Sequence, residues 1–270
     1  MSRRSDREFD QLLAFIEERM DFESGFYNDA YLDRRITARM RRTDTDSYAE
    51  YKRLLQRDDD EERQALLDSL SINVTGFFRN PDAWEALRPV LRELTEEKRH
   101  VDLWSAPCAD GREPYSAAML ALDDDEIVDR RVSILGTDIN RDVLQRARRA
   151  TYQTSQTTDI EAELEPLDEY EPYVDRDGDE FTVRPPVRDM VAFEQHDLIR
   201  GEAKRNFDLV FCRNLLIYID SEYKVPIFET ISESLRSGGF LMIGMTETLP
   251  TECRDAFEPV DKQHRIYRRV

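Results

Sequence analysis

Acidic side chains follow two predicted strands of this chain, at the positions where a sheet places its ligand-binding residues. The strand Val101–Trp104 is followed by a loop that carries Asp110 and Glu113. A second apolar strand, residues 132–138, ends in Asp138. In an open α/β sheet the ligand lies outside the carboxyl ends of the strands, so we expect these carboxylates around one pocket. A carboxylate at the end of the second strand can accept hydrogen bonds from both ribose hydroxyls of a nucleoside.

The loop after the first strand restricts the kind of nucleotide. It contains one glycine, Gly111, whereas the dinucleotide fingerprint has three around a pyrophosphate. A nucleoside without a pyrophosphate agrees with both the glycine count and Asp138. S-adenosylmethionine is such a ligand, and its sulfonium and ammonium charges suit the acidic residues Asp110, Glu113 and Asp138. These features alone leave open that Asp138 is only a cap or turn residue.

Two periodicities divide the chain. Apolar residues recur at helical spacing in its first part, which predicts a helical domain over residues 1–80. Beyond residue 100, short apolar strands alternate with helices, which predicts a mainly parallel sheet in a domain over residues 81–270. The alternation breaks at about residues 165–192, where two short runs flank Gly178 and predict an antiparallel β insertion. The expected fold class is therefore α/β, with a Rossmann-like sheet.

Composition excludes several classes of function. The chain has 39 basic and 58 acidic side chains and a net charge of −19, which disfavours a nucleic acid partner because the field repels phosphates. Its longest apolar stretch, near Tyr115–Leu122, is too short to cross a bilayer, and no secretory signal precedes the first helical pattern. We therefore predict a cytoplasmic protein without membrane insertion. Three cysteines without nearby histidines predict reduced packing residues and no metal site.

The basic side chains are almost all arginine, since the chain has only five lysines: Lys52, Lys98, Lys204, Lys224 and Lys262. We hypothesise a protein adapted to a salt-rich cytoplasm, where counterions screen the repulsion within an acidic surface. An ordinary acidic protein is the alternative.

Four segments in order along the chain carry a family resemblance. They are residues 73–80 (NVTGFFRN), 111–116 (GREPYS), 136–139 (GTDI) and 211–218 (FCRNLLIY). Together they resemble the CheR-type glutamate O-methyltransferases of methyl-accepting chemotaxis receptors, which are class I enzymes dependent on S-adenosylmethionine. The resemblance implies a small all-helical N-terminal domain joined to a methyltransferase domain with a β subdomain. It also implies chemotaxis receptors as the protein partner, and we expect a monomer.

The resemblance further implies roles for individual residues. Tyr218 matches the tyrosine near the transferring methyl, and Arg79 matches the segment that joins the two domains and closes over the cofactor near that methyl. We expect Arg79 to orient the acceptor carboxylate through charge-assisted hydrogen bonds, which makes Arg79 and Tyr218 the predicted catalytic residues. The implied contacts to S-adenosylmethionine, or to its product S-adenosylhomocysteine, are Asn73, Thr75, Arg79, Glu113, Asp138, Asp197, Leu198, Asn214 and Leu215. A glutamate acceptor is ionised at neutral pH, so no general base and no catalytic histidine is expected.

The chain departs from the family pattern at three places. The first loop usually resembles Ser-Thr-Gly-Glu-Glu-Pro, and here Asp110 and Arg112 replace two of its residues. Position 197 usually carries an amide rather than a carboxylate. Family members that dock on a receptor's C-terminal peptide resemble one another in a glycine-containing loop with arginines, whereas this chain has only Gly178 in a short acidic turn. We therefore expect direct recognition of the receptor's methylation helices rather than tethering.

Two other functions are considered. A non-catalytic module that binds S-adenosylmethionine and regulates receptors would keep the cofactor contacts, and the altered loop at Asp110 and Arg112 leaves it open. A nicotinamide-dependent Rossmann oxidoreductase is disfavoured by the single glycine, Gly111.

Overall fold

The computed structural model describes residues 3–20, 22, 24–57, 60–70 and 75–270, and the chain forms two compact units. The helical unit comprises Met1–Ile72 together with Tyr218–Tyr223, and the α/β unit comprises Asn73–Ile217 with Lys224–Val270. A short segment from late in the sequence therefore belongs to the N-terminal unit. The expected boundary at residue 80 and the extent of the β insertion, about 165–192, remain predictions.

The helical unit is built from amphipathic helices. They are α1 (Arg3–Met20), α2 (Asp29–Arg42), α3 (Tyr48–Gln56) and α4 (Asp60–Leu70), with a 3-10 turn η1 (Ser24–Phe26). Each helix buries completely a pair of apolar residues spaced four apart, which places both on one face: Leu12 and Ile16, Leu32 and Ile36, Tyr51 and Leu55, Leu66 and Leu70. Helix α1 packs on α3 and α2 packs on α4. The predicted helical domain is confirmed.

Side-chain caps fix two helix starts in this unit. Asn28 Oδ1 accepts a hydrogen bond from the backbone N–H of Tyr31 and so caps α2. The Ser47 hydroxyl accepts from Glu50 N–H at the start of α3. The sequence predicts this second cap, because a Thr-Asp-Ser run directly precedes the apolar pattern of α3.

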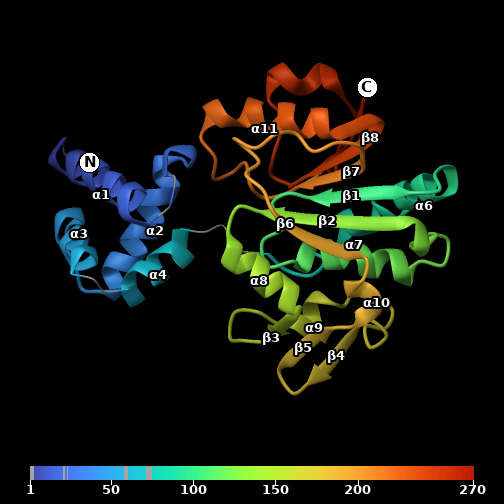
Figure 1. The fold of residues 1–270 in the computed structure, drawn as a ribbon, viewed down its shortest axis with the longest axis horizontal. Helices are drawn as coiled ribbons and strands as arrows, with labels where there is room; N and C mark the ends of the chain where they lie inside the picture. Colours follow the sequence, from blue (N-terminus) through green and yellow to red (C-terminus); the bar gives the residue numbers. More distant parts are fainter. Residues whose placement is uncertain (1–2, 21, 23, 58–59, 71–74) are drawn as a thin grey trace. The chain divides into compact units, whose positions relative to one another are not determined.

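A seven-stranded sheet forms the centre of the α/β unit (Figure 1). Its strands are β1 (Val101–Ser105), β2 (Val132–Asp138), β6 (Val191–Gln195), β7 (Phe207–Cys212), β8 (Leu235–Ile243), β9 (Phe257–Asp261) and β10 (Ile266–Arg269). The strand order is β6-β2-β1-β7-β8-β10-β9, and β10 runs antiparallel to both of its neighbours, β8 and β9, while the other pairs are parallel. The chain moves outward from β1 to β2 and β6, then returns to β7 on the other side of β1. The switch point between β1 and β7 is where such sheets bind ligands.

The helices of the α/β unit alternate with its strands. They are α5 (Pro81–Glu85), α6 (Arg88–Glu97), α7 (Arg112–Asp123), α8 (Arg141–Arg149), α9 (Ile160–Glu163), α10 (Pro185–Arg188) and α11 (Ser221–Ser234), with 3-10 turns η2 (Asp129–Arg131) and η3 (Thr251–Ala256). The apolar pattern predicts one helix from Pro81 to Leu94, but the structure has two, α5 and α6. Pro89 explains the break, because it lacks the N–H that would continue α5.

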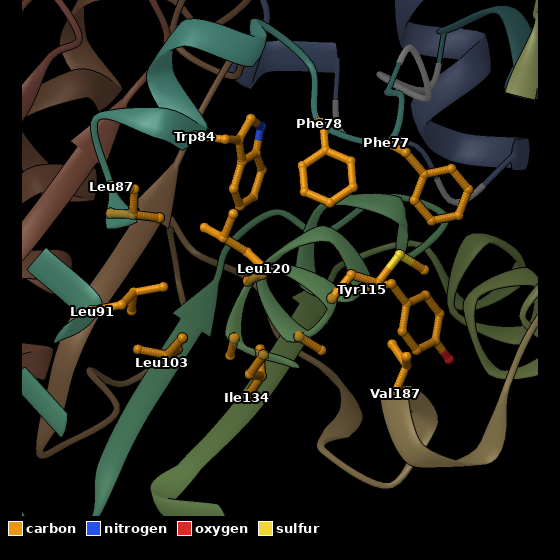
Figure 2. Close-up of a cluster of buried hydrophobic side chains, with 14 of the residues drawn as sticks. Phe77, Phe78, Trp84, Leu87, Leu91, Leu103, Tyr115, Leu120, Ile134 and Val187 are labelled. Atoms are coloured by element: carbon orange, nitrogen blue, oxygen red, sulfur yellow. The ribbon is translucent and has the colours of Figure 1, made fainter. Parts of the chain in front are cut away.

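The core of this unit lies against α7. Phe77, Phe78 and Trp84 are buried in one cluster, and Figure 2 shows their rings in a row above Tyr115 and Leu120 of α7. The Phe78 and Trp84 rings meet edge to face with centroids 5.6 Å apart. These buried aromatic rings fix the backbone on both sides of the residue between them in sequence, Arg79.

A second, three-stranded antiparallel sheet has the order β3-β5-β4 (Figure 1). Strands β4 (Val174–Asp177) and β5 (Glu180–Val183) form the hairpin that the sequence predicts. Strand β3 (Thr151–Gln153) pairs with β5 and is not indicated by the sequence pattern. The hairpin turn is acidic, and Arg176 of β4 pairs with Glu161 of α9 at 2.8 Å.

The described residues contain no helix that is long and apolar enough to cross a membrane. Within the same ranges, no cluster of three or more histidine, cysteine or carboxylate side chains is arranged to hold a metal ion. All three cysteines are buried and free, as predicted.

Candidate functional site

Asp138 ends β2, the neighbour of β1 in the sheet, and is almost completely buried, with 8% of its surface exposed. Its Oδ2 accepts a hydrogen bond from Ala109 N–H at 3.0 Å, and its Oδ1 accepts one from Asn140 N–H at 2.9 Å. The backbone N–H of Ile139 is a third donor to this carboxylate, which leaves one of its roughly four acceptor sites for a further donor. Burial raises the pKa of Asp138 to about 6. Asp138 is therefore placed to accept a hydrogen bond from a ribose hydroxyl.

Apolar and polar residues surround Asp138 at the ends of β2 and β6. Ile139, directly after it, is 46% exposed and offers an apolar surface at the carboxyl ends of the strands. The backbone N–H of His196 donates to the carbonyl of Asp138 at 3.1 Å, which brings the loop after β6 beside the site. In that loop Leu198 is buried, and Asp197 Oδ1 accepts from the N–H groups of the next turn. The loop with the two predicted cofactor contacts Asp197 and Leu198 is therefore adjacent to the predicted ribose acid.

Glu113 lies in the first turn of α7 and forms a buried ion pair with Arg213, which directly follows β7. Arg213 Nη1 lies 3.3 Å from Glu113 Oε2, and the Ser105 hydroxyl donates to Glu113 Oε1 at 2.8 Å. Burial raises the pKa of Glu113 and lowers that of Arg213. The sequence pattern predicts Glu113 as a cofactor contact but does not indicate Arg213, although Arg213 lies within the segment 211–218. The signal that could have found it is its position at a strand's carboxyl end.

Arg79 is linked to this ion pair through its backbone. Its carbonyl accepts hydrogen bonds from Arg213 Nη2 at 2.6 Å and from Trp84 Nε1 at 3.1 Å. The Arg79 side chain is half-buried, and its positive charge lowers the pKa of Glu113. The structure therefore brings together two residues predicted for the site, Arg79 and Glu113, with Arg213 between them.

The two residues that depart from the family pattern bind each other. Arg112 Nη2 lies 3.1 Å from Asp110 Oδ2, and Arg112 Nη1 lies 3.1 Å from Glu163 of α9. Glu163 also accepts the Phe77 N–H at 2.8 Å. Asp110 is therefore neutralised by Arg112 rather than left as a separate acidic contact. Through Glu163, Arg112 therefore links the first loop to the backbone of Phe77, two residues before Arg79.

The loop after β7 carries Asn214 and Leu215. Asn214 has a left-handed backbone, with φ of 60°, and Leu215 is buried. The Glu247 carboxylate accepts the N–H groups of Asn214 and Leu216. Glu247 is not indicated by the sequence pattern, although it follows β8 at the same edge of the sheet.

Three further residues were predicted for the site: Tyr218, Thr75 and Asn73. Tyr218 belongs to the helical unit, where it packs against the buried core of the helices. Thr75 is half-buried at the start of the segment that leads to Arg79. Asn73 lies outside the described residues.

The comparisons with known proteins agree with this geometry. Residues 7–71 match the family described as "CheR methyltransferase, all-alpha domain", and residues 73–266 match "CheR methyltransferase, SAM binding domain". The chain belongs to the CheR methyltransferase family. The predicted family, its methyltransferase fold and S-adenosylmethionine as its cofactor are therefore confirmed.

Curated relatives cover most of the chain. A "Chemotaxis protein methyltransferase" of Listeria monocytogenes is 33% identical, with 87% of each chain covered. One of Listeria innocua is 31% identical over the same shares, and "Chemotaxis protein methyltransferase 1" of Pseudomonas aeruginosa is 29% identical with 91% of each covered. These matches favour neither the regulatory module nor the nicotinamide-dependent oxidoreductase.

Proposed function

We propose that this CheR family member methylates glutamate side chains of methyl-accepting chemotaxis receptors. The observation that carries the proposal is the edge of the sheet, where the hydroxyl-accepting Asp138 and the Arg79 segment follow the strands of a CheR SAM-binding domain. When bound, S-adenosylmethionine supplies an electrophilic methyl group on a positively charged sulfur. Asp138 would hold its ribose, Ile139 would pack on its base, and the loop at Asn214 and Leu215 would hold its methionine part.

Arg79 would orient the acceptor. A receptor glutamate has a reference pKa of about 4.3, so it is already a carboxylate at neutral pH and needs no base from the protein. A guanidinium can align such a carboxylate through two parallel hydrogen bonds. Orientation of this kind, rather than proton transfer, is the contribution expected from these residues.

Transfer of labelled methyl to receptor-containing membranes tests the proposal. Alkaline treatment should release the label as volatile methanol, because esters hydrolyse and amine methyl groups do not. Asp138→Ala is the matched negative control. Label that resists alkali would mean a different acceptor, and no transfer with intact S-adenosylhomocysteine binding would favour the regulatory module.

The small sheet supports direct recognition of the receptor. Its hairpin turn at Gly178 is flanked by Asp175, Asp177 and Asp179, and Arg176 pairs with Glu161. This acidic turn differs from the glycine-containing loop with arginines that family members use to dock on a receptor's C-terminal peptide. A receptor that lacks its C-terminal peptide should therefore be methylated at an unchanged rate, and a large loss of rate would contradict direct recognition.

The net charge of −19 leads to the salt hypothesis. An acidic enzyme that acts on an acidic receptor helix should be assisted by screening, because the Debye length falls to about 3 Å at 1 M salt. Melting temperature and transfer rate should both rise across a KCl series. Full stability in dilute buffer would refute salt adaptation.

A further inference from the structure

Glu247 is a buried acid with three backbone partners from two segments. It lies just beyond β8 and is 3% exposed. Its Oε2 accepts the N–H of Gly244 at 2.6 Å and of Asn214 at 2.9 Å, and its Oε1 accepts the N–H of Leu216 at 2.7 Å. A single side chain therefore joins the end of β8 to the loop after β7.

The fit around this carboxylate is close. A Cβ atom on Gly244 would lie 2.5 Å from Glu247 Oε2 and 2.9 Å from the backbone nitrogen of Asn214. Only glycine therefore allows the loop and the carboxylate to approach this end of β8 so closely. Asn214 has a positive φ, a conformation that most residues adopt only when their surroundings impose it. Buried N–H groups need acceptors, and Glu247 supplies them for Asn214 and Leu216.

We propose that Glu247 is a positioning residue for the cofactor. Its carboxylate sets the backbone of Asn214–Leu216 and so places Asn214 and Leu215, the two contacts predicted for the methionine part. The inference rests on the proposed function for these two contacts. Glu247 itself acts through the loop and does not touch the reacting atoms.

Two substitutions separate this role from a general effect on folding. Glu247→Gln replaces one oxygen by an N–H₂ group that faces backbone donors, so at least one of the three hydrogen bonds is lost. Glu247→Asp keeps the charge, but its side chain is shorter and cannot reach all three groups. Glu252→Gln, which removes a charge from an exposed residue of η3, is the matched control.

Calorimetric titration of the full chain with S-adenosylhomocysteine provides the measurement. Positioning predicts a dissociation constant at least tenfold higher for Glu247→Gln and an intermediate value for Glu247→Asp, with the control unchanged. A merely structural role would lower the melting temperature and the fraction of binding-competent protein, while the remaining protein would keep the wild-type constant. That result, or constants within twofold for both variants, would overturn the proposal. If Glu247→Gln does not fold, Glu247→Asp alone decides.

A double substitution tests the route of action. In an Asn214→Ala background, Glu247→Asp should have a smaller effect than in the wild type, because the two residues act on the same contact. Fully additive effects would contradict action through Asn214. If the unmodified chain binds S-adenosylhomocysteine but methylates no receptor, the proposed function fails while the calorimetric comparison still decides the role of Glu247.

Discussion

The rings of Tyr31 and Tyr218 lie 4.7 Å apart between centroids, tilted by 51°, within the helical unit. Tyr31 belongs to α2, whereas Tyr218 follows the cofactor loop that begins after β7. Backbone hydrogen bonds hold the same segment, since Asn28 N–H donates to the Tyr218 carbonyl at 3.0 Å and Asp220 N–H donates to the Phe26 carbonyl at 2.9 Å. Tyr218 is therefore held within the helical unit by both its ring and its backbone.

Replacement of Tyr31 should affect methyl transfer more than cofactor binding. Tyr31→Leu keeps an apolar side chain but removes the ring contact with Tyr218, which is worth about 0.5–1.5 kcal/mol. We expect the turnover number to fall several-fold, because Tyr218 is predicted near the transferring methyl, and the S-adenosylhomocysteine affinity to stay within twofold. Steady-state rates and calorimetry measure the two quantities.

Tyr31→Phe is the control for this prediction. It keeps the ring and loses the hydroxyl, which donates to the Leu70 carbonyl at 3.0 Å. It should cost about 1 kcal/mol of stability and little turnover. Equal losses of turnover in both variants would show that the ring contact has no role in positioning Tyr218.

Removal of the Arg79 side chain should abolish most transfer and preserve the fold. The hydrogen bonds that Arg213 and Trp84 make in this segment end on the Arg79 carbonyl, which alanine retains. The loss of acceptor orientation should lower the rate about a hundredfold. Arg79→Lys should recover only part of the rate, because an ammonium lacks the planar fork. Arg99→Ala, at an exposed position, is the matched control, and a nearly normal rate for Arg79→Ala would refute its role.

The sequence predicts the fold best where a segment carries its own signal. Strands β1, β7 and β8 are apolar runs buried in the sheet, and the helical pairs have a clear period. The strand Val191–Gln195 (β6) is half-exposed at the sheet edge and has only a short apolar run, residues 190–193, so its pairing with β2 defines it. Strand β3 has only three residues and takes its structure from β5.

The candidate site also contains residues with a local sequence signal and residues that are defined only by long-range contacts. Asp138 and Glu113 were predicted because they stand at strand and helix ends inside recognisable motifs. Arg213 and Glu247 act through contacts between distant segments, and Glu247 is 33 residues from Asn214 in the sequence. Such contacts depend on the strand order β1-β7-β8, which the local pattern does not encode.

The buried pair of Glu113 and Arg213 should be sensitive to the loss of one partner. Arg213→Met leaves the Glu113 charge without its cation in a buried site, which costs about 3–5 kcal/mol. For a unit of this size we expect the melting temperature to fall by about 10 °C. Adding Glu113→Gln should restore part of that loss, because the uncompensated charge is gone. A melting temperature unchanged by Arg213→Met would mean that solvent reaches the pair.

Cofactor affinity should depend on pH through Asp138. The folded, unliganded protein holds this proton up to a pKa of about 6, because burial disfavours the carboxylate and the nearby Asp110 charge adds to the effect. The unfolded chain releases it near pH 3.9, so this group's contribution to stability is present below about pH 4 and is lost as pH rises through 6.

Binding reverses that preference. Hydroxyl donors and a positively charged ligand favour the ionised form, so the affinity for S-adenosylmethionine should be about tenfold weaker at pH 5 than at pH 7.5. At pH 6 binding should release about half a proton, measured by calorimetry in two buffers of different ionisation enthalpy. Asp138→Asn should bind more weakly at pH 7.5 and show a flat profile between pH 5 and 7.5. A wild-type affinity that does not change across this range would show that Asp138 does not take up the ligand's hydroxyl groups as a carboxylate.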